Sequence, residues 1–190
     1  MEGVDNMDSY VPLHLHTRVG SILDSMVNPI KEKKSECLLS LKAKQYKMPA
    51  LAITDHGSMA AVLSHYKTCK EYGIKPIIGC EFYVCDDINI KDKDSKYYHL
   101  VVLAKNNIGY QNLKKLSSIG YLDGFYYKPR IDFETLSKHS EGLIVLTACL
   151  AGELPRMIMK YHKTPTKKLE DDIKINAEQI NQVEVMLACN

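Results

Sequence analysis

The sequence predicts an α/β fold, in which apolar strands alternate with amphipathic helices along 190 residues. Continuous apolar runs at 48–54, 99–105 and 143–149 are typical of strands that are buried on both faces. Between the first two runs, residues 59–69 carry apolar side chains at helical spacing. We therefore expect a parallel sheet whose strands are joined by helices.

Taken in order, the apolar runs and the residues that end or cap helices define the remaining elements. Gly73 ends the helix that begins near residue 59, and Asn106 caps a further helix. Residues 124–130 read as an irregular segment that combines aromatic and basic side chains. The expected strands are 10–17, 48–54, 75–84, 99–105, 143–149 and 183–188. Further helices are expected at 28–46, 134–138, 153–162 and 165–180.

The composition is that of an ordinary globular protein and excludes several classes. Hydrophobic residues make up 45% and charged residues 25%, and the net charge of +2 does not by itself indicate a nucleic-acid-binding protein. No apolar run approaches the ~20 residues that a membrane span needs. The six cysteines form no Cys-x-x-Cys pair, which argues against a zinc ribbon and favours reduced, mostly buried thiols in a cytoplasmic protein.

The first expected strand carries two histidines, His14 and His16. Side chains at i and i+2 of a strand point to the same face, so both imidazoles should converge at its end. Three further polar residues lie in or after expected strands, namely His56, Glu81 and Cys149. In a parallel barrel the carboxyl ends of the strands hold the site, because the loops that follow the strands converge there. Two imidazoles that converge at such an end are a good start to a zinc or manganese site.

Six motifs, in one order, resemble a known family. They are HLHT, LAITDHGSM, IKPIIGCEFYV, HLVVLAKN, GFYYKPRID and LIVLTACLAGELP. Together they resemble the polymerase-and-histidinol-phosphatase (PHP) domain at the N-terminus of bacterial DNA polymerase III α subunits. The resemblance implies a distorted βα barrel, which has seven strands in the family and about six here. We expect an N-terminal tail at 1–9 and a PHP domain at 10–190.

The resemblance also implies a set of metal ligands and two or three bound Zn²⁺ or Mn²⁺ ions. The implied ligands are His14, His16, Asp24, His56, Glu81, His99 and Cys149. The family's last ligands, an Asp-x-His pair on a late strand, have no counterpart in this sequence. We therefore expect a domain that is incomplete at its C-terminus, with an open sheet edge that promotes self-association.

Two groups of residues have alternative roles. Asp55 either lies behind the ligands and fixes a histidine tautomer, or caps the helix that follows it. The segment with Tyr126, Tyr127, Lys128 and Arg130 either contacts phosphates and stacks on bases, or is a packed connection with a solvated basic rim. The other histidines, His65, His139 and His162, are expected to be structural.

The function implied by the resemblance is a part in DNA replication. The expected activity is metal-dependent phosphoester hydrolysis, acting as a 3′→5′ exonuclease on a single-stranded DNA end. DNA synthesis would belong to the rest of the polymerase α subunit, which is an expected partner together with other replisome subunits. Two alternatives stay open. One is a catalytically incomplete domain that supports the polymerase or a proofreading partner, and the other is a small-molecule phosphatase.

Overall fold

The computed structural model of the chain describes residues 10–21, 35–93, 95–161 and 184–186. The described part is a mixed α/β structure, which confirms the expected fold class. The chain divides into two compact units, Met1–Cys80 and Glu81–Asn190, and the boundary falls within one strand, β2 (Lys75–Cys85). The expected helix at 165–180 and the beginning of the helix expected at 28–46 lie outside the described residues.

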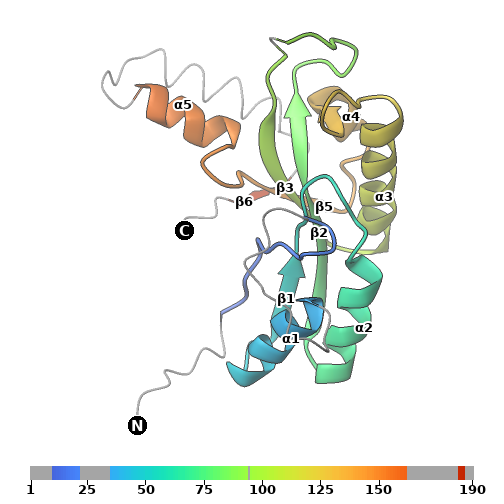
Figure 1. The fold of residues 1–190 in the computed structure, drawn as a ribbon, viewed down its shortest axis with the longest axis vertical. Helices are drawn as coiled ribbons and strands as arrows, with labels where there is room; N and C mark the ends of the chain where they lie inside the picture. Colours follow the sequence, from blue (N-terminus) through green and yellow to red (C-terminus); the bar gives the residue numbers. More distant parts are fainter. Residues whose placement is uncertain (1–9, 22–34, 94, 162–183, 187–190) are drawn as a thin grey trace. The chain divides into compact units, whose positions relative to one another are not determined.

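The first unit pairs two parallel strands and packs helices beside them. Its other elements are α1 (Ser35–Gln45), β1 (Ala50–Ile53) and α2 (Val62–Tyr72). Ala50 of β1 lies beside Lys75 of β2, and Ile53 lies beside Ile78. Figure 1 shows α1 and α2 packed next to β1.

The apolar run at 48–54 contains β1, and all four residues of this strand are buried. Leu51 packs with Cys69 and Ile74 in the core of the unit. α2 ends where the sequence predicts, at Gly73, which adopts the left-handed conformation with φ of 73°. The buried His65 ring places Nε2 3.1 Å from the Leu51 carbonyl and so attaches α2 to β1. His65 is therefore a structural residue, as expected.

The expected strand at 10–17 is not a regular strand, and this prediction is wrong in that detail. The segment still lies along β1, because Ala52 N donates to Pro12 O and Thr54 N donates to Leu15 O. Pro12 has no N–H to return to a ladder. In addition, the segment advances by three residues, from Pro12 to Leu15, where its neighbour advances by two, from Ala52 to Thr54. A regular register between the two therefore cannot continue.

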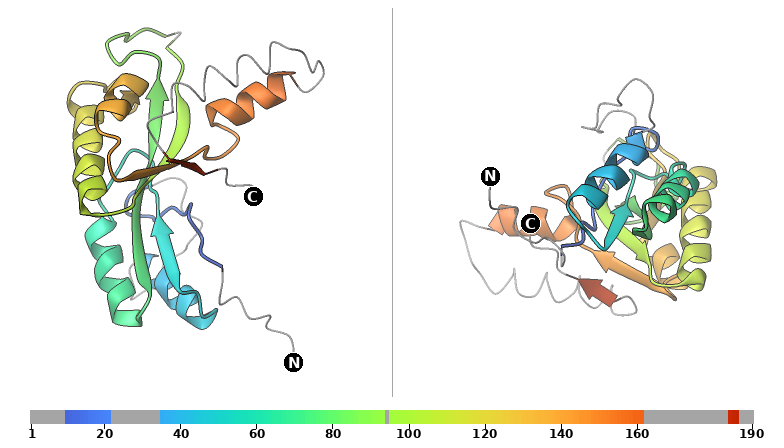
Figure 2. Two further views of the ribbon diagram at one scale, coloured as in Figure 1. Left: turned by 180° about the vertical axis from the view of Figure 1, so that it is seen from behind. Right: turned by 90° about the horizontal axis from the view of Figure 1, so that it is seen from below.

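The second unit contains the rest of β2 and the remaining elements. These are β3 (Tyr98–Ala104), α3 (Asn107–Leu122), β4 (Arg130–Asp132), α4 (Phe133–Lys138), β5 (Leu143–Leu146), α5 (Glu153–Tyr161) and β6 (Glu184–Met186). Its strand order is β4-β2-β3-β5-β6, so the described strands of this unit form an open sheet. In Figure 2, α3 runs along one side of this sheet.

The strands of the second unit are not all parallel, which corrects the expected parallel sheet. β2 pairs with β4, and β5 with β6, in parallel. β3 and β5, however, are antiparallel, with Val101 beside Leu146 and Ala104 beside Leu143. The amino end of β3 consequently lies beside the carboxyl end of β5.

The beginning of α3 is fixed to the beginning of β5. The Asn106 side chain accepts a hydrogen bond from Gly109 N at 3.0 Å, which confirms the expected cap. A Cβ at Gly109 would lie 1.8 Å from the Gly142 carbonyl oxygen, so only glycine allows this approach.

None of the helices in the described ranges is both long enough and apolar enough to cross a membrane.

Candidate metal centre

Three histidines gather in the first unit. His14 and His16 come from the segment beside β1, and His56 lies three residues after the end of β1. The His14 and His16 ring centroids are 5.0 Å apart, and the His16 and His56 rings stack at 4.2 Å with an angle of 14°. Imidazole groups from two separate parts of the chain therefore share one small region of this unit.

A buried carboxylate organises the backbone around these histidines. Asp55 Oδ1 accepts hydrogen bonds from Thr17 N at 2.6 Å and from Ser21 Oγ at 3.0 Å, and Oδ2 accepts one from Thr17 Oγ1 at 2.9 Å. Ser21 Oγ also accepts from His56 N at 3.0 Å and lies 3.4 Å from His16 Nδ1. Asp55 thus reaches both histidines through Ser21.

Asp55 does not cap the following helix, because α2 has Ala61 at its N-cap position. Burial raises the pKa of the Asp55 carboxyl, while the hydrogen bonds from Thr17 and Ser21 act in the opposite direction. Gly20 makes room for the carboxylate, since a Cβ there would lie 2.2 Å from Asp55 Oδ2. The segment that follows His16 is therefore shaped around Asp55.

The second unit holds a different cluster, formed by Glu81, His99 and Cys149. Glu81 is only 1% exposed, and its Oε1 lies 3.1 Å from His99 Nδ1. The Cys149 thiol lies 3.6 Å from His99 Nδ1 and 3.9 Å from Glu81 Oε1. Glutamate, histidine and cysteine side chains, which are among the commonest zinc ligands in proteins, meet here.

The antiparallel pairing of β3 with β5 explains why His99 belongs to this cluster. His99 is the second residue of β3, whereas Cys149 lies three residues after the end of β5. Because the two strands run in opposite directions, these positions lie side by side, and His99 N donates to Ala151 O. Ala148 has a φ of 60°, a left-handed conformation that turns the chain just before Cys149.

The rings of two tyrosines lie next to the His99 ring. The Tyr83 ring meets it edge to face at a centroid distance of 5.2 Å, and the Tyr97 ring is parallel to it at 6.5 Å. Sequence reasoning missed both tyrosines. It also missed Thr17 and Ser21, although both follow His16 closely in the sequence.

The donor groups fit a divalent metal ion. Five of these residues each offer one ligand atom to a group of three that could hold a metal ion, namely His14, His16, His56, Glu81 and His99. Nitrogen, carboxylate and sulfur donors in one set suit zinc, manganese or iron. Asp24, the remaining ligand implied by the family resemblance, lies outside the described residues.

The expected phosphate-binding segment needs one correction. Arg130 is 1% exposed, and its guanidinium donates to Gly124 O, Ser95 Oγ, Ile88 O and Ile90 O. These bonds occupy the guanidinium inside the unit, so at Arg130 the structure favours the packed connection over a phosphate contact. Tyr127, by contrast, is 82% exposed, and Lys128 Nζ lies over the Tyr83 ring at 5.3 Å.

The fold and these clusters define a mixed α/β protein with histidine and glutamate groups able to hold a metal ion. The chain belongs to the PHP domain family, whose model matches residues 12–190. It is 45% identical over 159 residues to the DNA polymerase III subunit alpha of Treponema pallidum, and that match covers 82% of this chain. It is 42% identical over 172 residues, or 87% of this chain, to the same subunit of Thermus aquaticus.

The chain spans about 13% of the Treponema pallidum subunit and 14% of the Thermus aquaticus subunit. Among solved structures, one match is a putative metal-dependent phosphoesterase from Bifidobacterium adolescentis. It is 12% identical with a TM-score of 0.46, and the match covers 94% of this chain and 86% of that protein.

Proposed function

We propose that this chain is the PHP part of a DNA polymerase III α subunit and that it serves DNA replication by binding divalent metal ions. The identity of 45% to a subunit of this type, over 82% of the chain, supports the polymerase context. DNA and the remainder of the α subunit are the partners that this context implies.

The proposed metal ligands are His14, His16 and His56 in the first unit and Glu81, His99 and Cys149 in the second. The proposal rests above all on Glu81. A carboxylate that is 1% exposed is costly to bury unless its charge is balanced, and here an imidazole lies at 3.1 Å with a thiol beside it. Asp24 is proposed as a seventh ligand on the family resemblance alone. Zn²⁺ and Mn²⁺ are the ions that this donor set favours.

The proposed chemistry is hydrolysis of a phosphodiester at a 3′ DNA end. A bound divalent ion supplies Lewis acidity and neutralises negative charge on phosphate oxygens. The protein residues then have two tasks. The ligands fix the ion, while Asp55, through Thr17 and Ser21, holds the segment that carries His14 and His16 in place.

The second candidate function is that of a structural domain without hydrolytic activity, the alternative that the sequence analysis leaves open. In this second function the same clusters bind metal and stabilise the domain, and no nucleotide is released.

Two measurements separate these functions. Metal analysis of the purified chain tests for bound zinc, manganese or iron, and Glu81→Gln should lower the metal content while Glu71→Gln, an exposed glutamate, should not. A chain that binds none of these metals would refute both functions. Incubation with 3′-labelled single-stranded DNA then tests hydrolysis, with His14→Ala as the control for a contaminating nuclease. Metal-dependent release of nucleotides that His14→Ala abolishes supports the exonuclease, and metal binding without release supports the structural domain.

A further inference from the structure

The exposed face of α3 carries positive charge and no negative charge. The helix carries Lys114 and Lys115 and contains no acidic residue. Its buried face consists of Gly109, Asn112, Leu113, Leu116 and Gly120. The lysines therefore lie on the opposite face, and within the described residues neither forms an ion pair with a carboxylate.

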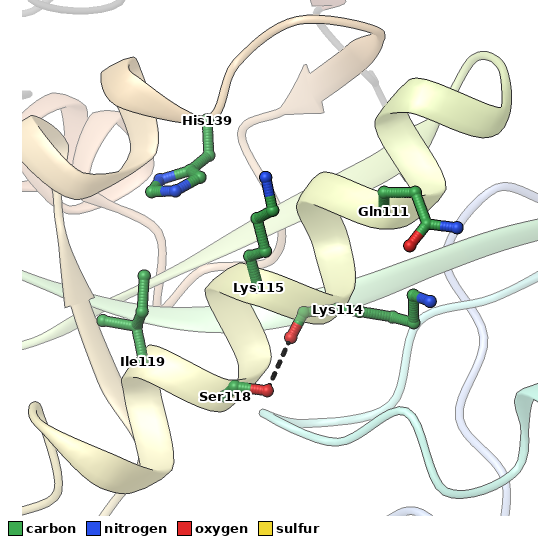
Figure 3. Close-up of a pocket in the computed structure, with 6 residues that line it drawn as sticks. All are labelled: Gln111, Lys114, Lys115, Ser118, Ile119 and His139. Carbon is green, nitrogen blue, oxygen red and sulfur yellow. Dashed lines mark hydrogen bonds between the residues drawn. The ribbon is translucent and has the colours of Figure 1, made fainter.

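A surface groove of about 420 Å³ lies on this face. Its lining residues are Gln111, Lys114, Lys115, Ser118, Ile119 and His139. Figure 3 shows Lys115 extending toward the end of α4, where His139 lies. His139 Nδ1 is 3.0 Å from the Thr135 carbonyl oxygen, and because a carbonyl only accepts, this bond holds the ring with its proton on Nδ1. Basic and amide side chains thus line an open groove that contains no acidic residue.

The charged side chains that line the groove are cationic, and its lining contains no carboxylate. The nearby carboxylate of α4, Glu134, is engaged by Lys138 at 2.6 Å. Lys114 Nζ lies over the Tyr110 ring at 5.0 Å, so its ammonium is held by a cation–π contact, which does not cancel its charge. The groove therefore favours an anionic partner.

Aromatic side chains continue the same helical face. Tyr121 follows Ser118 by three residues and Lys114 by seven, which places all three on one side of the helix over a length of about 10 Å. Tyr121 is 50% and Phe125 48% exposed, and their rings stack at a centroid distance of 6.3 Å and an angle of 22°. Two half-exposed rings thus lie beyond Lys114, on the same side of α3.

From this arrangement we infer that the α3 face is a binding surface for single-stranded nucleic acid. Lys114 and Lys115 contact backbone phosphates, and Tyr121 and Phe125 stack on bases. Lysines beside exposed aromatic rings are the combination that binds single strands without sequence preference, because every base has a face that can stack. An acidic polypeptide would satisfy the lysines but would not use the exposed rings. The surface goes beyond the proposed metal site, and none of its residues is a proposed ligand.

Fluorescence anisotropy with a labelled oligothymidylate tests this inference. The full chain is used in buffer with EDTA, so that binding is measured without metal and without hydrolysis. Lys114→Glu/Lys115→Glu should weaken binding by roughly tenfold or more. The slope of log Kd against log salt concentration should also fall by about 1.4, because each lost phosphate contact lowers it by about 0.7. Lys67→Glu/Lys70→Glu, on the exposed side of α2, makes the same change in net charge and should have little effect.

Tyr121→Ala provides a second test, which does not depend on charge. It should weaken binding roughly fivefold or more through loss of stacking, while the salt dependence stays unchanged. Circular dichroism checks that each variant is folded. The inference is overturned if the parent chain does not bind the oligonucleotide, if both lysine pairs matter equally, or if polyglutamate binds as tightly as DNA. An oligouridylate in parallel shows whether the strand is DNA or RNA.

Discussion

His99 Nδ1 lies 3.1 Å from Glu81 Oε1, and these two residues come from β3 and β2 of the same unit. Glu81 is the more deeply buried partner, and His99 is fixed by Tyr83 as well. A pair of this kind holds an imidazole and a carboxylate in place before any ion arrives. At the proposed metal site, this arrangement would limit the entropy lost when an ion binds.

Cys149→Ser should change the preference for metals. The variant replaces a soft sulfur ligand with a hard oxygen ligand, so the affinity for Zn²⁺ should fall by about tenfold or more while the affinity for Mn²⁺ changes less. Calorimetric titration of the apo chain with each ion gives both constants. An equal loss for the two ions would mean that the thiol does not contact the metal.

Gly20→Ala should destabilise the first unit and lower its affinity for metal. The added Cβ would lie 2.2 Å from Asp55 Oδ2, so either the carboxylate or the segment after His16 must move. Gly73→Ala is the matched control: its Cβ meets nothing within 4 Å, and its positive φ costs only about 1 kcal/mol. Urea unfolding compares the two variants, and a smaller loss at Gly20 than at Gly73 would contradict the close packing around Asp55.

Arg130→Met should lower the free energy of unfolding by about 3 kcal/mol, because one buried and three partly buried oxygens lose their donor. The guanidinium donates to three carbonyl oxygens and one hydroxyl, whereas a thioether donates to none. Lys128→Met, two residues earlier, is the control and should stay within about 0.5 kcal/mol of the parent chain. If Arg130→Met were as stable as the parent chain but impaired in DNA binding, the structural role assigned to Arg130 would be wrong.

Stability should fall in alkaline solution partly because of Cys69. Burial raises the pKa of this thiol above its ordinary 9.0, although a hydrogen bond with Ser40 opposes the shift. Above that pH the unfolded chain loses the proton and the folded chain keeps it. The unfolded state therefore binds fewer protons, and the free energy of unfolding decreases as pH rises.

Cys69→Ala should reduce that decrease, and the measurement is urea unfolding at about pH 8 and about pH 10. The slope with pH is compared and not the absolute stability, because the variant also leaves a small cavity. Burial raises the pKa of Cys85 in the same way, so Cys69→Ala/Cys85→Ala should flatten the slope further. A slope unchanged by both substitutions would refute this account.

The sequence predicts most of the regular elements because their local signals are strong. Continuous apolar runs mark β1, β3 and β5. The end of α2 follows from Gly73, and the beginning of α3 follows from Asn106. β4 was missed, because it has only three residues and two of them, Arg130 and Asp132, are polar. Their burial depends on bonds to distant parts of the chain, such as the one from Arg130 to Ser95, which leave no periodic pattern.

The candidate site was only partly predictable for a similar reason. The convergence of His14 and His16 follows from their spacing, but the contact between Asp55 and Thr17 joins residues 38 positions apart. To predict that His99 lies beside Cys149, the direction of β3 relative to β5 must be known. Strand direction is set by how the chain returns to the sheet, and local sequence does not encode it.

Cys149 also differs from three other cysteines, because Cys69, Cys80 and Cys85 are buried whereas Cys149 is exposed. An alkylating reagent applied to the native protein should therefore modify Cys149 before these three, and peptide mapping can identify the labelled position. A thiolate that coordinates a metal reacts slowly with such reagents. The rate of alkylation at this one residue consequently reports occupancy of the cluster around Glu81 and His99, and no foreign probe has to be introduced.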